Sequence, residues 1–244
     1  MADQDYIRRV VDELSDKFEL AKSEAISAML GLVEGKTNAE AIAILNELDV
    51  GKVMEAKTSG ILGGYIAGNK GLLLGKEMFA EITESTLQAL LTQSEQYLSG
   101  QIAAMSSTLK QEVINGIINK RTVSEIAEVV GAKGYGSVGM KRIINDGLNN
   151  YSRAVSRMMM DEAPQNAKYV YVGPADEKTR PFCLSAIQVG AITMDEIISM
   201  GGEWEASLTE GGGINCRHSW ELASTDIRSQ FHRGKEAEEI INAG

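Results

Sequence analysis

The residues of this sequence that offer the most chemistry are its two cysteines and one of its two histidines. Cys216 and His218 stand two residues apart, and Cys183 lies upstream of them. A glycine turn at 211–213 precedes a segment, Ile214–Trp220, that we predict to be a short strand. Because successive side chains of a strand point to opposite faces, Cys216, His218 and Trp220 are expected to share one face. The sequence therefore places one thiol beside an imidazole, with a second thiol available to meet them.

Three kinds of chemistry use such a set. A structural zinc site usually takes four Cys or His ligands, and the only further candidates for a fourth ligand are His232 and Asp176. A thiol nucleophile needs a base and a group that orients the base. A buried pair of thiols beside a histidine needs neither, and we favour that interpretation: reduced in the cytosol, the pair would be able to join in oxidising surroundings. We expect no catalytic residue and no metal, and if zinc is bound, its ligands are Cys183, Cys216 and His218.

A polar turn lies between these thiols and an upstream strand. Tyr169–Val172 is rich in β-branched and aromatic residues, as strands are, and a Gly-Pro pair ends it. Asp176, Thr179 and Arg180 follow. An aspartate in such a turn usually caps local backbone N–H groups, and an arginine reaches a carboxylate or a carbonyl across the fold. We therefore predict structural roles for these three residues.

Two glycine-rich motifs resemble phosphate-binding loops. Residues 134–139, GYGSVG, match the G-x-G-x-x-G pattern, but a dinucleotide site needs a strand before the glycines, and here a capped helix precedes them. We interpret the motif as a glycine loop between two helices. Residues 71–77, GLLLGKE, are one residue too short for a phosphate loop and lack the Ser or Thr after the lysine. We reject that interpretation.

The composition limits the partners. The chain of 244 residues carries a formal charge of −10, with an isoelectric point near 4.9, which disfavours direct binding to nucleic acid or to an anionic membrane. We find no apolar run of about 18 residues, the length that spans a membrane, and no apolar core of signal-peptide type at the N-terminus. Two cysteines in this length fit a cytosolic product with reduced thiols. We therefore expect a soluble product without membrane partners.

Apolar residues recur at helical spacing through most of the first 160 residues. Thr122 and Glu125 form a Thr-x-x-Glu capping box, and Asn38 is the expected N-cap of an earlier helix. Gly100 is the expected break or kink in the longest periodic segment. The predicted helices are 6–33, 38–48, 76–118 in one piece or two, 122–131 and 137–160.

The stretch 58–75 combines many glycines with aliphatic residues and has almost no charge. One interpretation is helices that pack closely through glycine faces. The other is an apolar arm that becomes ordered against a partner, since exposed apolar patches usually mark interfaces. In that case the contact residues are Ile61, Leu62, Tyr65, Ile66, Leu72, Leu73 and Leu74.

Pro164 marks the expected start of a different region. Beyond it we predict the strand and turn described above, a short helix opened by a second capping box at Thr193 and Glu196, and a charged tail from Thr225. The predicted fold class is mainly α, with a helical N-terminal region followed by a small α+β C-terminal domain. The predicted divisions are 1–112, with the arm at 58–75, then 113–163, a helix-loop-helix, and 164–244.

The spacing of these residues resembles a known module. Asp176-x-x-Thr179-Arg180-Pro181-x-Cys183, followed after about thirty residues by Asn215-Cys216-Arg217, is similar to the C-terminal module of phage Mu F-like minor head proteins, the head-morphogenesis family. That module typically has an aromatic strand, an Asp-x-x-Thr-Arg-x-x-Cys turn and a closing His-Pro-Asn-Cys-Arg-Cys segment. The segment from Val113, VINGIINKRTVSEIAEVV, also resembles the helix–Gly–helix element of the family. The resemblance covers about Val113 to Leu222.

The sequence departs from the family pattern in three places. Gly213 and Ile214 stand where the family has His and Pro, and His218 stands where it has its last Cys. IINDGLNN replaces an Ala-Arg-Thr-Glu segment of the long helix. The resemblance implies a minor structural protein of a tailed-phage head, assembled in the host cytoplasm with the portal, the major capsid protein or the scaffold, and located in the virion. The alternative is a zinc- or thiol-dependent enzyme centred on Cys183, Cys216 and His218.

Overall fold

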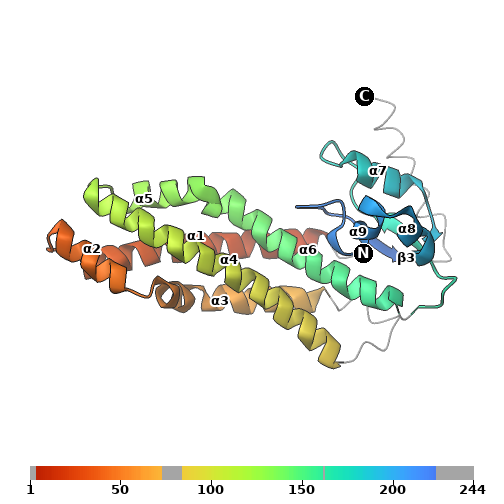
Figure 1. The fold of residues 1–244 in the computed structure, drawn as a ribbon, viewed down its shortest axis with the longest axis horizontal. Helices are drawn as coiled ribbons and strands as arrows, with labels where there is room; N and C mark the ends of the chain where they lie inside the picture. Colours follow the sequence, from red (N-terminus) through yellow and green to blue (C-terminus); the bar gives the residue numbers. More distant parts are fainter. Residues whose placement is uncertain (1–3, 73–83, 162, 224–244) are drawn as a thin grey trace. The chain divides into compact units, whose positions relative to one another are not determined.

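The structure is a computed structural model that describes residues 4–72, 84–161 and 163–223 (Figure 1). Helices dominate, and a three-stranded antiparallel sheet lies near the C-terminus. The predicted fold class, mainly α with a small α+β C-terminal part, is confirmed. The described chain forms two compact units, of which the first, the helical unit, comprises 5–68 and 92–147. The second, the C-terminal unit, comprises 148–223 with 69–72 and 84–91. The boundaries between the two units, at 68/69, 91/92 and 147/148, each fall inside a helix.

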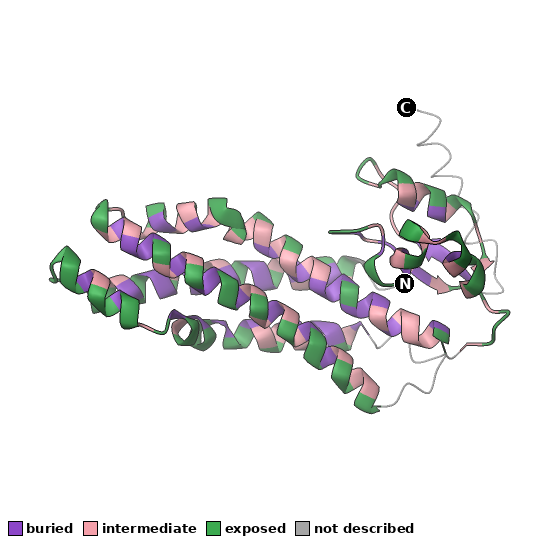
Figure 2. Cartoon of the chain, viewed as in Figure 1, coloured by how far each residue is buried: buried purple, intermediate pink, exposed green. Residues whose placement is uncertain are grey.

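The helical part of the chain follows the predicted periodicity. The first long helix buries Ile7, Leu14, Phe18 and Ala25 along one face and exposes the opposite face, as an amphipathic helix does (Figure 2). The helices are α1 (Gln4–Leu32), α2 (Asn38–Glu47), α3 (Val50–Gly71), α4 (Glu84–Ile118), α5 (Val123–Val130), a π-helical turn (Gly131–Tyr135) and α6 (Ser137–Asp161). In the described part of the chain, no helix is both long enough and apolar enough to cross a bilayer.

Capping decides where the short helices begin. The N-cap of α2 is Thr37, not Asn38 as predicted, because Thr37 and Glu40 form a capping box: the Thr37 backbone N–H donates to the Glu40 carboxylate at 2.9 Å. The capping box at Thr122 and Glu125 is confirmed at the start of α5. In each box the hydrogen bonds from the threonine lower the pKa of the glutamate.

Gly100 does not break the fourth helix. α4 runs without interruption from Glu84 to Ile118, and the predicted start of this helix at Lys76 lies outside the described residues. Glycine costs a helix interior roughly 1 kcal/mol, but Leu98, Ile102 and Met105 on either side are buried and hold the helix through this position.

The glycine-rich stretch is helical as far as Gly71, where α3 ends. A Cβ on Gly64 would lie 2.7 Å from Leu14 Cδ2, and one on Gly147 would lie 2.0 Å from the Tyr65 hydroxyl, so small residues allow these close approaches. Tyr65 is fully buried and its hydroxyl is 2.9 Å from Ser94 Oγ. The interpretation as closely packed helices therefore describes this stretch, and Leu73 and Leu74 lie outside the described residues.

The C-terminal unit is built on β1 (Lys168–Val172), which is the central strand in the order β2-β1-β3. Tyr171 pairs with Trp220 across β1 and β3. β2 is Ile192–Thr193 and β3 is Ser219–Leu222, and the helices are α7 (Pro181–Gln188), α8 (Met194–Met200) and α9 (Gly202–Glu210). The aromatic rings of Tyr171, Phe182, Trp204 and Trp220 contact one another in the core of this unit.

Two features of this unit differ from the prediction. The strand expected from Ile214 begins only at Ser219, which pairs with Val172, the last residue of β1. Asn215, with a positive φ of 63°, lies in the turn that precedes the strand. Burial nevertheless alternates from Cys216 through Trp220, so Cys216, His218 and Trp220 are buried as expected. Helices α7 and α9 were not predicted, since neither segment shows a sustained helical period.

Candidate functional site

Two thiols and an imidazole meet in the core of the C-terminal unit. Cys183 lies on α7, whereas Cys216 and His218 lie on the segment that leads into β3. The two sulfur atoms are 3.7 Å apart, and Cys216 Sγ is 3.6 Å from His218 Nδ1. The three donor atoms lie within 4.8 Å of one another, and the side chains are 1–3% exposed. The fold thus brings Cys183 to the Cys216–His218 pair, which lies more than thirty residues further along the sequence.

The orientation of His218 is fixed by its neighbours. Its Nε2 lies 3.0 Å from the carbonyl oxygen of Pro174, which can only accept a hydrogen bond, so Nε2 carries the hydrogen. The other ring nitrogen, Nδ1, then faces Cys216 Sγ. The ring of Tyr171 stacks on the imidazole with the centroids 5.5 Å apart and the planes 8° from parallel. A Cβ on Gly173 would lie 2.2 Å from His218 Cδ2, so only glycine fits beside this ring.

The two thiols are electrostatically unequal. The hydrogen bond from Cys183, and then those from the backbone N–H groups of Gly212 and His218, hold the pKa of Cys216 below the usual range of a thiol. The same hydrogen bond with Cys216, together with burial, raises the pKa of Cys183. Burial, and then the charges of the two cysteines, raise the pKa of the adjacent Tyr171 hydroxyl. These hydrogen bonds favour the thiolate form at Cys216 over the thiolate form at Cys183.

A glycine loop closes over the sulfur atoms. A Cβ on Gly212 would lie 2.3 Å from Cys183 Sγ, and one on Gly211 would lie 3.0 Å from Cys216 Sγ. The Arg180 guanidinium holds this loop, because it donates to the carbonyl oxygen of Gly212 at 2.7 Å and to that of Ile214. Arg180 is also the N-cap residue of α7, the helix that carries Cys183. One arginine therefore links both cysteine-bearing segments.

Asp176 and Arg217 form a bidentate ion pair, with N–O distances of 2.7 and 2.6 Å. Asp176 also accepts a hydrogen bond from the Lys178 backbone at 3.0 Å, and the Thr179 hydroxyl donates to the Pro174 carbonyl at 2.8 Å. The hydrogen bonds and charge of Arg217 lower the pKa of Asp176 to about 2. Because both oxygens of Asp176 bond to Arg217, Asp176 does not supply the fourth ligand that the sequence left open. His232 lies outside the described residues.

Arg153, on α6, belongs to this site although no sequence motif marks it. This arginine is 2% exposed. Its guanidinium donates to the carbonyl oxygens of Thr209, Cys216 and His218 at 3.0, 3.2 and 3.4 Å, and to Asn150 Oδ1 at 2.6 Å. It stands two helical turns before Met160, which packs in the core of the same unit. Arg153 thus holds the backbone on either side of the Cys216–His218 pair.

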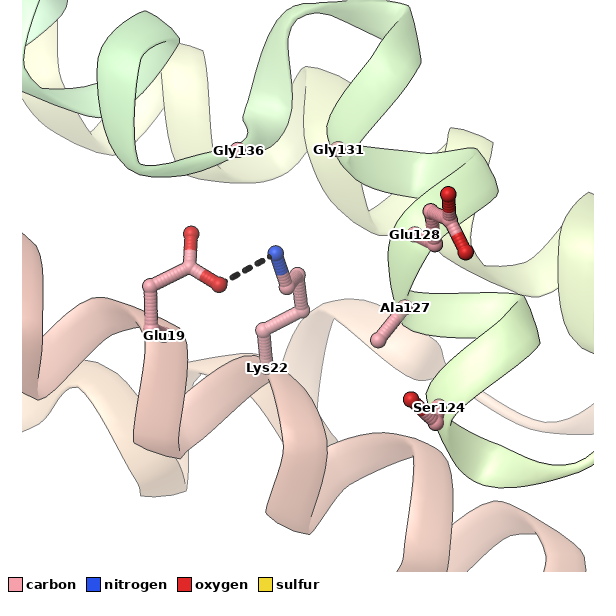
Figure 3. A pocket seen from close by; sticks show the side chains of 7 residues that line it. All are labelled: Glu19, Lys22, Ser124, Ala127, Glu128, Gly131 and Gly136. Carbon is pink, nitrogen blue, oxygen red and sulfur yellow. Dashed lines mark ion pairs between the residues drawn. The ribbon is translucent and has the colours of Figure 1, made fainter.

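A hollow of about 480 Å³ lies in the helical unit (Figure 3). Lys22 enters it from α1 and is almost fully buried, but its Nζ is 2.7 Å from Glu19 and 3.2 Å from the Tyr135 carbonyl. The remaining lining residues are Ser124, Ala127, Glu128, Gly131 and Gly136. The ammonium of Lys22 is thus already neutralised within the chain, and we assign it a structural role.

The glycine motif at 134–139 joins α5 to α6 through the π-helical turn. α5 precedes it, so the strand that a dinucleotide site requires is not there, as expected. Gly134 has a φ of 99°, and a Cβ on Gly139 would lie 1.8 Å from the Gly134 carbonyl oxygen. The glycines therefore serve the tight turn itself.

Comparison of the chain with models of protein families, with curated proteins and with solved structures finds no match.

Proposed function

We propose that the chain is a minor structural or assembly protein of a tailed-phage head, which docks to the portal or to the major capsid protein during head morphogenesis. One observation carries the proposal. The two separated parts of the motif that resembles the Mu F-like module meet in one hydrogen-bonded framework, in which the two cysteines are buried and the ion pair is partly exposed. Asp176 pairs with Arg217, Arg180 holds the loop before Cys216, and Cys183 lies beside Cys216.

The contacts of this framework favour a structural role over a catalytic one. Both oxygens of Asp176 are used by Arg217, and the guanidinium of Arg180 is used by backbone carbonyls. Such groups are already hydrogen-bonded within the chain and would have to break those bonds to act on a substrate. The motif residues therefore serve best as the frame of a rigid module that other proteins contact.

Only part of the predicted apolar arm, 58–75, is available as a docking segment. Ile61, Tyr65 and Leu72 are buried, with 0–4% exposure, so their side chains are used for packing. Leu62 and Ile66 are half-buried on the same helix and remain the candidate contact residues of the described part of this stretch. Removing the whole stretch would unfold the helical unit, so docking is better tested with surface substitutions than with a deletion.

Binding to the proposed partners can be tested with purified components. The full chain is co-expressed with the portal protein of its source phage and, separately, with the major capsid protein, and complexes are measured by size-exclusion chromatography with light scattering. The proposal expects a stable complex with one of them that Leu62→Asp or Ile66→Asp weakens at least tenfold. The exposed substitution Glu55→Gln, on the same helix, serves as the control. Failure to bind either partner would contradict the docking proposal.

The enzyme alternative has one observation in its favour, which is the distance of 3.6 Å between Cys216 Sγ and His218 Nδ1. Against it, Cys216 is 3% exposed and Gly211 and Gly212 cover the sulfur atoms. A substrate would have to displace that loop and Arg180 with it. A Cys216→Ser variant that folds and still supports head assembly would exclude a thiol enzyme as the source of the function.

A further inference from the structure

We propose that Cys183, Cys216 and His218 bind one Zn²⁺ ion through two thiolates and one imidazole nitrogen. The site would fasten α7 to the segment before β3. This inference is independent of the role in phage assembly. It rests on the geometry of the three side chains, on the groups that orient them and on the balance of charge.

The spacing of the donor atoms matches a tetrahedral zinc site. With Zn–S bonds of about 2.3 Å and Zn–N bonds of about 2.1 Å, tetrahedral angles put two sulfur ligands about 3.8 Å apart and a sulfur and a nitrogen ligand about 3.6 Å apart. The corresponding distances here are 3.7 Å between the two Sγ atoms and 3.6 Å between Cys216 Sγ and His218 Nδ1. The fold therefore sets two edges of the coordination polyhedron without the ion.

The outer groups are those that zinc sites use to hold their ligands. A histidine ligand usually donates its second ring N–H to a carboxylate or a backbone carbonyl, which directs the other nitrogen to the metal. His218 does this with the Pro174 carbonyl. Arg153 holds the carbonyl groups of Cys216 and His218, and Arg180 holds the glycine loop. These hydrogen bonds hold the three ligand side chains in place without the ion, so binding the ion requires little further ordering of the chain.

The fourth position belongs to an oxygen donor. The Tyr171 hydroxyl is 3.8 Å from Cys216 Sγ and also lies beside Cys183. Asp176 is held by Arg217 and does not reach the cluster. We assign the fourth position to the Tyr171 oxygen or to a water molecule that it holds. Three protein ligands with an oxygen in the fourth position is an arrangement that Zn²⁺ accepts.

The charges balance when the ion is bound. Both cysteines coordinate as thiolates, each sulfur and Nδ1 donate an electron pair, and the displaced thiol protons pass to solvent. Two negative sulfurs and a doubly positive ion leave a neutral site, which suits a buried position, since an unpaired buried charge is costly. Soft sulfur ligands favour Zn²⁺ and Cu⁺ over Mg²⁺ or Ca²⁺. No oxidation or reduction is involved.

The direct test measures metal on the purified full chain. The protein is reduced with a phosphine, stripped with chelator, incubated with excess Zn²⁺ and desalted, and bound zinc is counted by plasma mass spectrometry. The expected result is one ion per chain and a Tm at least about 5 °C above that of the metal-free protein. Substitution with Co²⁺ is expected to give the near-ultraviolet thiolate-to-metal absorption bands.

Variants separate ligands from neighbours. Cys183→Ser, Cys216→Ser and His218→Gln should each lower bound zinc at least tenfold, whereas Ser185→Ala, an exposed position on α7, should bind as the wild type does. The wild-type measurement does not depend on the folding of any variant. A reduced, folded wild-type chain that retains less than about one tenth of an equivalent of zinc and shows no cobalt–thiolate band would overturn the proposal. Wild-type binding with an unchanged His218→Gln variant would overturn the assigned ligand set.

Discussion

Arg153 gives the sharpest test of how the C-terminal unit is held together. Replacing it with methionine keeps a long, flexible side chain with good helix propensity but removes every donor. The carbonyl oxygens of Cys216 and His218 then lose a buried partner, and those of Thr209 and the Asn150 side chain lose a partly buried one. Only the sheet and the aromatic core would then hold α6 against the segment that carries Cys216 and His218.

The size of the effect follows from these acceptors. An unsatisfied buried carbonyl costs about 1–3 kcal/mol, so two fully buried ones cost about 2–6 kcal/mol. Relief of the desolvation of the guanidinium offsets part of this loss. We expect Arg153→Met to lower the free energy of unfolding of the C-terminal unit by about 3 kcal/mol.

Tryptophan fluorescence isolates this unit, because Trp204 and Trp220 are the only two tryptophans of the chain and both pack in its core. Urea unfolding is followed at pH 7 in reducing buffer with chelator, so that neither a disulfide nor a metal contributes. The matched control is Arg157→Met, one turn along the same helix, where the arginine is 28% exposed and pairs with Asp161. That change should cost only about 0.3–0.5 kcal/mol.

The difference between the two variants tests the role of Arg153 whatever the absolute stability of the wild type. If Arg153→Met costs no more than Arg157→Met, the guanidinium does not hold the backbone around Cys216 and His218. The account of this site as a rigid, backbone-anchored frame would then be refuted.

Three further predictions concern other parts of the chain. Because Arg217 lowers the pKa of Asp176 from 3.8 to about 2, the stabilisation from this ion pair is fully present above pH 3.8 and is lost as the pH falls through 2. Asp176→Asn should therefore lower the free energy of unfolding by about 0.5–1 kcal/mol at pH 7, after solvent screening of this partly exposed pair. Equal stability of the variant and the wild type in urea at pH 7 would contradict this prediction. Gly212→Ala should lower the free energy of unfolding by about 1–3 kcal/mol in the same assay, because the added Cβ would lie 2.3 Å from Cys183 Sγ. An unchanged unfolding midpoint would contradict the close contact between this loop and Cys183. Gly100→Ala should stabilise the helical unit by about 0.5–1 kcal/mol, because α4 is continuous at this position and no atom lies within 4 Å of the added Cβ. Urea unfolding followed by circular dichroism measures the change, and a loss of stability would indicate a break in the helix.

The elements predicted best from the sequence are those specified by local pattern. The helical period of α1, the capping boxes at Thr122 and Thr193, and the aromatic strand at Tyr169–Val172 all depend on neighbours within a few residues. The error at the start of α2 is instructive. Asn38 and Thr37 are both good N-caps, and Glu40 decides between them because it stands at the third position after Thr37.

The rest depends on contacts that no local pattern encodes. The loop before β3 is held by Arg180 and Arg153, whose acceptors are backbone carbonyls that any residue provides. Such acceptors leave no trace in the sequence, so Arg153 could not be found from it. The period-2 pattern correctly placed Cys216 and His218 on one buried side, but the strand begins only at Ser219, where β1 supplies the first pairing partner, Val172.

The most direct test of the proposed function is quantitative mass spectrometry of purified particles from the source phage or from an induced prophage. The proposal predicts that the chain copurifies with heads at a few to a few tens of copies per particle, far fewer than the major capsid protein. The amount should survive density-gradient banding and high-salt washing. Complete absence from both mature heads and procapsids would contradict the assignment as a head component, and the Cys183–Cys216–His218 cluster would then be the first place to look for a different function.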